Sequence, residues 1–415
     1  MSSQSRFSSG SASGDVDALS APPEPPTGAG RRVRVGYVLT AISEGGLERF
    51  TLELGRRLPK DRFEPIVYSL TPHAPWGHRF QQEGIPVRTY RARNRPESGS
   101  WWPNLRTIFE LARDLRRDGV EIVHTCDFYP ATIGRLSAFL ARIPGRVHTL
   151  HSLYDWYPQW AHRINRLLAS KTQQIIAVSN PVLESSVKLD KLPSDRYQLV
   201  HNGVDPTLFY PVPSARGELR SRLGLPDSAR IIATVGAYTV RKGHRTVAQA
   251  VIPLLKEDPD LHLALFGTRP EPEFDITAEL REAFGRAGFA DRLHMPGPVE
   301  DVRTVYCGSD IFCMASQVEG LSLASIEAQM CGCLCIFSDI PSFREVAQEG
   351  VNGFLFPVGE ADSLRRALRF VLTLSPERAA AIRNAARSMA EARFPISQTV
   401  EGYRRIYEEV LGSVR

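Results

Sequence analysis

Short runs rich in β-branched and aromatic residues alternate with longer helical stretches along this chain, and this alternation most constrains its fold. The first series of strand candidates comprises Val33–Leu39, Ile66–Leu70, Glu121–Thr125, Arg146–His151, Ile175–Ser179 and Gln198–His201. The second comprises Ile231–Val235, His262–Phe266, Arg292–Met295, Ile311–Met314, Leu334–Phe337 and Gly353–Phe356. Strands joined through helices form parallel sheets with helices on both faces. The chain is therefore predicted to have an α/β fold with two Rossmann-like domains.

The boundary between the two series is predicted at Asp205–Ser214. This segment holds Pro206, Pro211 and Pro213, which interrupt both helices and sheets. We expect residues 31–205 to form the first domain and residues 206–385 the second. Residues 1–30 are mostly Ser, Gly, Ala and Pro, a composition that cannot bury enough apolar surface to fold, so a disordered tail is expected there.

Apolar residues at helical spacing predict the buried faces of two helices in the first domain. Leu47, Phe50, Leu54 and Leu58 share one face of the helix that follows the first strand. A second helix, Asn104–Arg117, is expected to bury the apolar residues Leu105, Ile108, Phe109, Ala112 and Leu115.

Composition and charge narrow the class of protein. Hydrophobic residues make up 42% and charged residues 23%, as in soluble globular proteins. No apolar run approaches the roughly 20 residues that span a bilayer, and no signal peptide is visible, so we expect a cytoplasmic protein. Residues 31–196 carry 26 Lys and Arg against 16 Asp and Glu. This excess favours an anionic partner such as a membrane surface, although solvated arginines on outer helix faces explain it equally well.

The segment Val318–Ala328 holds the strongest signal of a binding site. Ser322 is positioned to cap a helix whose free N–H groups and dipole would suit a phosphate. Glu319 precedes the helix, and Glu327 is expected on its polar side. Two carboxylates so placed can accept hydrogen bonds from sugar and ribose hydroxyls. An ordinary surface helix with two solvated glutamates is the alternative.

Two weaker signals accompany it. Arg241 and Lys242 lie in a glycine-containing loop after the first strand of the second domain, where they could neutralise a diphosphate without a metal. His151 ends a strand of the first domain, a position that is more often structural than catalytic. We expect no metal site, because Cys333 and Cys335 share one face of an apolar strand and should pack in the core. No nucleic-acid-binding module is recognisable.

Together these motifs resemble those of the retaining glycosyltransferases of family four, which have the GT-B fold. The resemblance runs from about Arg34 to about Arg369 and includes the Glu319 and Glu327 pair. Its remaining motifs are Gly45-Gly46-Leu47-Glu48, the strand end at His151, His201-Asn202-Gly203-Val204-Asp205, Arg241-Lys242-Gly243-His244 and Ser338-Asp339-Ile340-Pro341-Ser342-Phe343-Arg344-Glu345-Val346.

The resemblance implies a set of residue roles. Glu319, His151 and Lys242 would act at the reacting centre, where Glu319 holds sugar hydroxyls and Lys242 contacts the donor diphosphate. Glu327 would hold the ribose of the nucleotide. The other donor-binding positions implied are Arg241, Leu321, Ser322, Leu323, Gly45 and Gly46. Such an enzyme moves a sugar from a nucleotide-sugar to a glycan or lipid-linked acceptor, with retention of configuration and without an essential metal or other cofactor.

The resemblance also implies a place for the end of the chain and leaves some points open. Residues 386–415 would form helices that pack back on the first domain. Many family members have an arginine where this chain has Ala237, and Arg241 is a candidate to replace it. A nucleotide-sugar epimerase of related fold and a non-catalytic glycan- or nucleotide-binding protein remain as alternatives. We expect the pathway to be the synthesis of a surface polysaccharide or glycolipid, while the sugar, the nucleobase and the acceptor stay open.

Overall fold

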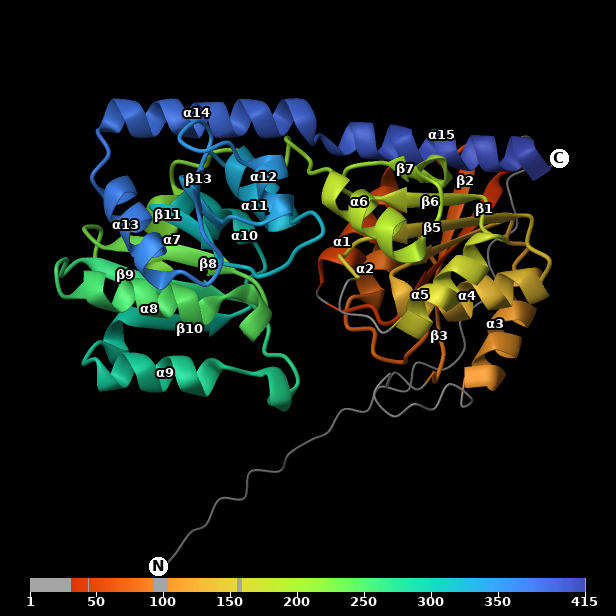
Figure 1. Cartoon of the computed structure of the whole chain (residues 1–415), viewed down its shortest axis with the longest axis horizontal. Coiled ribbons are helices and arrows are strands. Elements are labelled where there is room, and N and C mark those ends of the chain that lie inside the picture. The colour runs from red at the N-terminus through yellow and green to blue at the C-terminus, as the bar shows by residue number, and fades with distance from the viewer. Residues whose placement is uncertain (1–30, 44, 93–103, 155–158, 415) are drawn as a thin grey trace, which may run out of the picture.

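The computed structural model of the chain describes residues 31–43, 45–92, 104–154 and 159–414 (Figure 1). The tail expected at residues 1–30 lies outside these. Two parallel sheets, each with helices on both faces, confirm the predicted α/β fold with two Rossmann-like domains. The first sheet holds β1 (Val33–Leu39), β2 (Phe63–Ser69), β3 (Val87–Thr89), β4 (Ile122–Cys126), β5 (Gly145–Leu150), β6 (Gln174–Ala177) and β7 (Tyr197–Leu199). The second holds β8 (Arg230–Val235), β9 (Leu261–Phe266), β10 (Leu293–Gly297), β11 (Ile311–Met314), β12 (Cys335–Ser338) and β13 (Phe354–Phe356).

The order of the strands determines where each sheet can bind a ligand. The first sheet runs β3-β2-β1-β4-β5-β6-β7, and the second runs β10-β9-β8-β11-β12-β13. In each sheet the first strand has a neighbour on either side: β2 and β4 flank β1, and β9 and β11 flank β8. The chain first adds strands on one side of it and then returns to add the remaining strands on the other side. Ligands of open parallel sheets bind beyond the carboxyl ends of the strands at this point. The loops that follow β1 and β8 therefore border the most favourable binding positions.

Most strand predictions agree with the structure to within a few residues, but β3 was missed. It has only three residues, Val87–Thr89, too few to show an alternating pattern. The predicted burial of Cys333 and Cys335 is confirmed, but only Cys335 belongs to a strand, because β12 begins there.

The buried face predicted for α3 (Leu105–Arg117) is only partly correct: Ala112 and Leu115 are buried and Ile108 is half-buried, but Leu105 and Phe109 are not buried. Thr107, Leu111 and Leu115 form its buried stripe, whereas Leu105 is 47% exposed and Phe109 is 63% exposed. These two residues lie about 80° and 120° around the helix from Leu115, because each residue advances roughly 100°. α3 packs against the sheet and α4 (Phe128–Leu140) through the side that carries Leu111, Ala112 and Leu115, so Leu105 and Phe109 remain at the surface.

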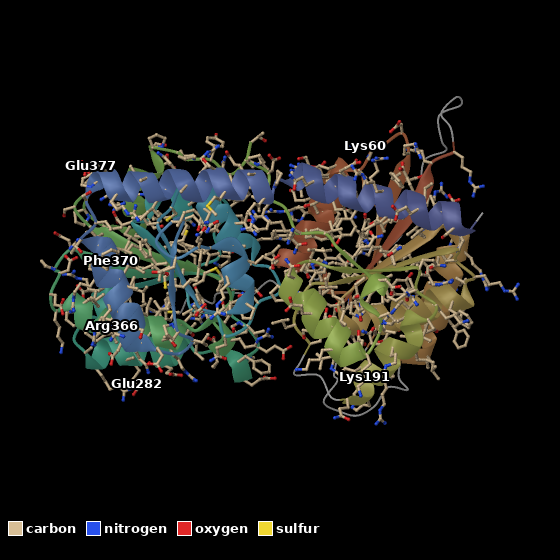
Figure 2. The ribbon with its side chains drawn as sticks, turned by 45° about the horizontal axis from the view of Figure 1, so that its top comes forward. Lys60, Lys191, Glu282, Arg366, Phe370 and Glu377 are labelled. Atoms are coloured by element: carbon tan, nitrogen blue, oxygen red, sulfur yellow. The ribbon has the colours of Figure 1, made fainter. Side chains whose placement is uncertain are left out.

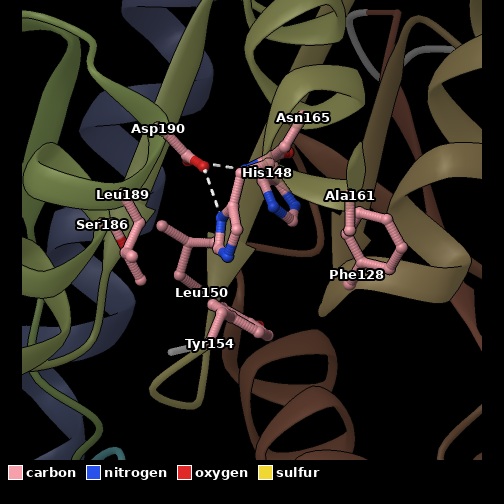
Figure 3. A pocket seen from close by; sticks show the side chains of 10 residues that line it. Phe128, His148, Leu150, Tyr154, Ala161, Asn165, Ser186, Leu189 and Asp190 are labelled. Atoms are coloured by element: carbon pink, nitrogen blue, oxygen red, sulfur yellow. Dashed lines mark hydrogen bonds and ion pairs between the residues drawn. The ribbon is translucent and has the colours of Figure 1, made fainter. Parts of the chain in front are cut away.

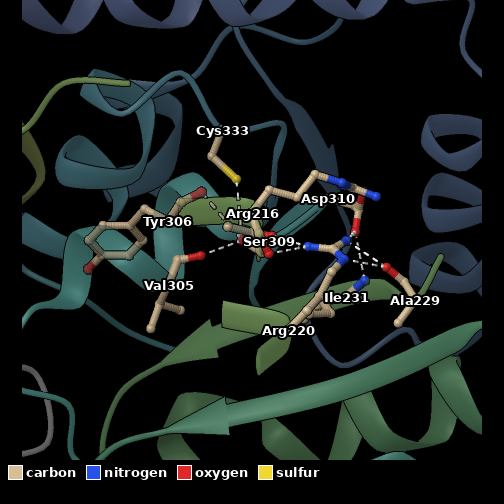
Figure 4. A network of polar contacts seen from close by, with 10 residues as sticks. Arg216, Arg220, Ala229, Ile231, Val305, Tyr306, Ser309, Asp310 and Cys333 are labelled. Carbon is tan, nitrogen blue, oxygen red and sulfur yellow. Dashed lines mark hydrogen bonds and ion pairs between the residues drawn. The ribbon is translucent and has the colours of Figure 1, made fainter. Parts of the chain in front are cut away.

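A buried arginine on α7 (Ala215–Leu223) holds this helix against the starts of β8 and β11 in the second domain (Figure 4). Arg220 is 1% exposed and donates to the carbonyls of Ala229 and Gly308. Its guanidinium also binds the Asp310 carboxylate at 2.8 Å, and this carboxylate accepts the N–H of Ile231. The network lies where β8 and β11 begin, at the opposite end from their carboxyl ends, so it is structural.

The last two helices span both domains. α14 (Pro376–Arg393) packs on α11 (Leu323–Met330) of the second domain, and α15 (Ile396–Val414) packs on β5 and α1 (Gly46–Arg57) of the first (Figure 1). The return to the first domain, expected from residue 386, takes place at Pro395. There Val204 and Pro395 form a parallel bridge, so the two segments that connect the domains lie side by side.

Buried tyrosines hold α15 on the first sheet. The hydroxyl of Tyr407 lies 2.7 Å from Nδ1 of His124 and 3.1 Å from the hydroxyl of Tyr37. The hydroxyl of Tyr403 lies 3.1 Å from Oγ1 of Thr149. Because these groups are buried, each contact satisfies a polar atom that would otherwise be costly to place in the core.

Candidate functional site

The loop between β11 and α11 is built as the sequence predicts. Ser322 caps α11, because its Oγ accepts the N–H of Ser325 at 3.4 Å. Leu321 is buried and Leu323 is half-buried, which fixes the start of the helix against the core. The first amides of α11 are therefore presented at the carboxyl end of β11, where the helix dipole favours an anion.

Lys242 and Glu319 form an ion pair at this loop. Lys242 ends a single 3₁₀ turn, Val240–Lys242, and its Nζ lies 2.6 Å from Oε1 of Glu319. Gly243 follows with φ of 70°, and a Cβ there would lie 1.9 Å from the carbonyl oxygen of Ala315. Only glycine allows this close approach, which brings Lys242 to the end of β11. Arg241 is exposed on the same turn.

Glu327 is buried, which corrects the expectation that it lies on the polar side of its helix. It is 3% exposed, and its Oε2 accepts the hydroxyl of Tyr306 at 2.8 Å. Its Oε1 accepts from Arg49 of the first domain at 2.9 Å, so the ion pair crosses from one domain to the other. The charge of Glu327 raises the pKa of the Arg49 guanidinium, and burial raises that of the Tyr306 hydroxyl.

The first domain contributes the start of α1 and the end of β5. Gly45 is the residue before α1, and Gly46 begins the helix. Glu48 is 8% exposed and accepts the hydroxyl of Ser43 at 3.0 Å, and burial raises the pKa of its carboxyl group. The motif that contains Glu48 was recognised in the sequence, but no role was assigned to this carboxylate.

His151 follows β5 and stays neutral in the fold. Its Nε2 is buried without a hydrogen-bond partner among the described residues, and its ring meets Phe50 edge-on at 4.9 Å. Burial lowers its pKa to about 4. Nearby, Asp127 accepts the hydroxyl of Tyr154 at 2.5 Å and has φ of 57°, a conformation that few residues other than glycine adopt. Sequence reasoning missed Asp127, although an acidic residue directly after a strand was a usable signal.

Contacts between the domains bring these two groups of residues together. A Cβ at Gly320, next to Glu319, would lie 1.9 Å from the carbonyl oxygen of His151. The hydroxyl of Ser179 donates to the carbonyl of Gly320 at 2.8 Å. Glu345, on α12 (Pro341–Val346), accepts from the Asn180 amide at 2.8 Å and lies 2.6 Å from Nε2 of His201. Sequence spacing could not identify Ser179 or Glu345 as contacts between domains.

Glu319, Lys242 and His151 thus lie together where the two domains meet. A pocket that none of them lines lies inside the first domain (Figure 3). It is enclosed by β5 and the helices α4, α5 (Gln159–Ala169) and α6 (Asn180–Asp190). Asp190 accepts from Asn165 at 2.6 Å there and lies 3.3 Å from Nδ1 of His162. None of the predicted site residues lines this pocket. Among the described residues, no group of three His, Cys, Asp or Glu side chains could hold a metal ion.

Two family models match the chain and together cover both domains. Residues 44–208 match the model described as Glycosyltransferase Family 4, and residues 215–389 match Glycosyl transferases group 1. The fold and the matches define a glycosyltransferase. The chain belongs to glycosyltransferase family four and has the GT-B architecture, as the motifs predicted.

Named relatives are glycosyltransferases as well. The UDP-Gal:alpha-D-GlcNAc-diphosphoundecaprenol alpha-1,3-galactosyltransferase of Escherichia coli is 24% identical over 354 residues, 81% of this chain and 87% of the relative. The lipopolysaccharide core biosynthesis mannosyltransferase LpsB of Rhizobium meliloti is 25% identical, over 86% of this chain and 87% of the relative. These matches favour a transferase over the epimerase and the non-catalytic binding protein.

Solved structures share the fold. HepE of Anabaena in complex with UDP and glucose superposes with a TM-score of 0.79 at 21% identity, covering 92% of this chain and all of that one. Sucrose-phosphate synthase of Thermosynechococcus elongatus gives a TM-score of 0.75 at 20% identity, with 92% and 100% covered. No helix in the described part of the chain is long and apolar enough to cross a membrane.

Proposed function

We propose that the enzyme transfers a sugar from a nucleotide-sugar donor to an acceptor hydroxyl with retention of configuration. The observation that carries this proposal is the Lys242–Glu319 ion pair at the start of α11, beside His151 of the other domain. A cation, a carboxylate and a set of free helix amides are the groups that a sugar diphosphate requires. The names of two similar proteins support the donor class, because one uses UDP-Gal and another holds UDP and glucose.

Without a donor, Lys242 and Glu319 pair with each other, and this arrangement suggests how the donor is bound. When the diphosphate enters, Lys242 would turn from Glu319 to a phosphate oxygen. The amides of Leu321, Ser322 and Leu323 would contact the same diphosphate at the helix start. Glu319 would then be free to accept hydrogen bonds from hydroxyls of the sugar, and Glu327 from those of the ribose.

Transfer would proceed by departure of the nucleoside diphosphate from the anomeric carbon. The acceptor oxygen bonds to that carbon on the face that the leaving group vacates, and its proton passes to the departing phosphate oxygen. The protein then stabilises the charge that develops on the diphosphate, which is the role of Lys242 and the helix amides. We propose that no metal or other cofactor is needed, because these groups supply the positive charge.

The acceptor is proposed to be a growing surface polysaccharide or glycolipid at the cytoplasmic face of the membrane. The two relatives act, by their names, on a diphosphoundecaprenol-linked sugar and in lipopolysaccharide core biosynthesis. Residues 31–196 carry 26 Lys and Arg against 16 Asp and Glu, and this positive excess would attract the phosphates of such a lipid.

A donor assay with a charge-neutral variant tests the proposal. Thermal shift with UDP-galactose, UDP-glucose, UDP-N-acetylglucosamine and GDP-mannose identifies the donor, and acceptor-dependent release of the nucleoside diphosphate measures turnover. Glu319→Gln should lower kcat/KM by at least ~30-fold, because it removes a charged acceptor of about 2 kcal/mol from the reacting sugar. Glu279→Gln is the control, since Glu279 pairs with Arg245 at an exposed site. If no nucleotide-sugar stabilises the protein, or if Glu319→Gln keeps full activity, the proposal is wrong.

A further inference from the structure

Two cysteines that are not among the proposed donor contacts lie together in the second domain. All six cysteines of the chain carry free thiols. Cys307 is on α10 (Val302–Gly308), and Cys331 directly follows α11. The Sγ of Cys307 lies 3.3 Å from the carbonyl oxygen of Tyr210 and 4.0 Å from that of Cys331. The two thiols also form a hydrogen bond with each other, so their sulfur atoms are already in contact.

The two thiols differ in access and in acidity. Cys307 is half-buried beside Tyr210, which is 41% exposed, whereas Cys331 is 3% exposed. α14 covers the end of α11 (Figure 2), and from there Arg387 donates to the carbonyl of Met330 at 2.9 Å. The hydrogen bond between the thiols lowers the pKa of Cys307 and raises the pKa of Cys331. Cys307 is therefore the more reactive thiol of the pair, and Cys331 lies behind it.

Neighbouring groups also stabilise the thiolate of Cys307. Arg303 lies one turn before it on α10, and its charge lowers the pKa of the thiol, as does a hydrogen bond from the N–H of Val212. Burial opposes these effects, but the pKa stays below that of an ordinary thiol. Accessible thiols of lowered pKa that have a second thiol beside them are the ones that hydroperoxides oxidise most readily to disulfides.

We propose that Cys307 and Cys331 form a site of reversible oxidation by hydroperoxides. The thiolate of Cys307 attacks one oxygen of hydrogen peroxide, so that an S–O bond forms and the O–O bond breaks. The hydroxide that leaves takes up the proton that the thiol had released. Cys331 then attacks the sulfur of the Cys307 sulfenic acid: an S–S bond forms, the S–O bond breaks, and the hydroxyl group leaves as water with the proton of Cys331. Two thiols lose two electrons in all, and one peroxide becomes two molecules of water.

The disulfide would act on the helix that is proposed to hold the donor, and this consequence rests on the proposed function. Tyr306 precedes Cys307 and donates to the carboxylate of Glu327 at 2.8 Å. The amide of Cys331 donates to the carbonyl oxygen of Glu327 at 2.9 Å. A bond between the two cysteines would therefore tie both supports of Glu327 to each other. Since Glu327 would then be less free to turn to a ribose, oxidation should weaken donor binding.

Peptide mapping of the full chain after treatment with hydrogen peroxide tests the proposal. Remaining thiols are blocked with N-ethylmaleimide, and the unreduced digest is analysed by mass spectrometry. Cleavage after Glu319 and Glu327 separates Cys307 from Cys331, whereas no Lys or Arg lies between them. We expect a linked pair of peptides whose fragments join Cys307 to Cys331, lighter by two hydrogens than the reduced peptides and separated by dithiothreitol.

Three variants identify the role of each thiol. In Cys331→Ala the sulfenic acid at Cys307 should persist and react with dimedone, whereas Cys307→Ser should give neither this adduct nor the disulfide. Cys333→Ala is the matched control, because Cys333 is as buried as Cys331 but its Sγ lies 3.7 Å from Oγ of Ser309. This control should form the disulfide as the wild type does. The proposal is wrong if Cys307 stays reduced, if it pairs with Cys333 instead, or if dimedone labels another cysteine of Cys331→Ala equally.

Calorimetric titration with the donor measures the consequence for the site. Oxidation should weaken donor binding to the wild type by about threefold or more, the effect of one impaired hydrogen bond, and dithiothreitol should restore it. Cys307→Ser should bind the donor equally well before and after peroxide. A disulfide that leaves donor affinity unchanged would show that it does not act on Glu327. If the reduced protein binds no nucleotide-sugar, the proposed function fails, and the peptide map still decides the oxidation site.

Discussion

The carbonyl oxygen of His151 lies where a side chain at Gly320 would begin. A Cβ at position 320 would be 1.9 Å from that oxygen, well inside any tolerated contact. His151 belongs to the first domain, and Gly320 follows the Glu319 that pairs with Lys242 in the second. The two domains can therefore meet at the site only because residue 320 has no side chain.

Gly320→Ala should keep the two domains apart without unfolding either one. The added methyl group blocks the approach of His151, so we expect kcat to fall by about 100-fold or more, as displacements near 1 Å do in active sites. Donor affinity should change little, because the donor groups lie mainly on the second domain. Steady-state kinetics and calorimetric titration with the donor measure the two effects. Gly217→Ala is the control, since a Cβ there meets nothing within 4 Å; unchanged kcat in Gly320→Ala would refute the expectation.

Arg49→Gln should tighten donor binding. In the donor-free enzyme Arg49 occupies Oε1 of Glu327 at 2.9 Å, and a ribose that uses this carboxylate has to compete with it. Because the side chain of Arg49 is 35% exposed, the competing contact is worth only about 1 kcal/mol, which predicts a three- to tenfold lower dissociation constant. Calorimetric titration of Arg49→Gln and of the control Arg56→Gln tests this. Arg56 lies on the same helix but pairs with Glu53 within its own domain. Weaker donor binding in Arg49→Gln would show that the arginine assists the nucleotide.

Lys242→Met should depress turnover strongly. Loss of a charge-assisted contact to the leaving diphosphate in a partly closed cleft costs roughly 1.5–3 kcal/mol, or tens- to hundreds-fold in kcat/KM. Arg241→Met in parallel, and the double variant, show by a mutant cycle whether Arg241 shares the phosphate in place of the arginine absent at Ala237. If Lys242→Met is as active as the wild type, the diphosphate assignment is wrong.

Activity should persist in EDTA. Lys242 and the amides at the start of α11 would supply the positive charge that a divalent ion supplies in metal-dependent transferases. The measurement is turnover after dialysis against EDTA, compared with turnover after adding Mg²⁺ or Mn²⁺ back. Complete loss on chelation with recovery on adding either ion would contradict the proposal.

Stability should fall as the pH drops from about 6.5 towards 4. Burial lowers the pKa of His151 to about 4, so in this window the unfolded chain binds a proton at this residue that the folded chain does not. Acid therefore favours unfolding, by up to about 1.4 kcal/mol per pH unit for each such histidine, and the stabilisation is fully present above the unfolded value. His151→Asn should flatten the dependence of Tm on pH relative to the wild type. His78→Gln is the control, because His78 is exposed. Equal slopes of Tm against pH in all three proteins would show that His151 does not cause the loss of stability in acid.

The sequence by itself determined the features that depend on neighbours along the chain. Strand positions followed from apolar runs, the start of α11 from Ser322, and the family from short motifs such as Glu319 with Glu327. These signals are local, because a cap bonds an amide three residues away and a strand is recognised by its own side chains. Each could therefore be predicted without knowing the arrangement of the sheets.

Only the tertiary structure decided which distant residues meet and which apolar stripe of a helix faces the core. Arg49 and Glu327 are 278 residues apart, and the spacing on α1 and α11 contains no information on how the two helices face each other. On α3, the spacing of apolar residues predicted a buried face that included Phe109, and packing against α4 and the sheet buried Leu111 while leaving Phe109 exposed. The reason is physical: burial depends on what the rest of the chain places opposite a side chain, and local spacing does not specify that.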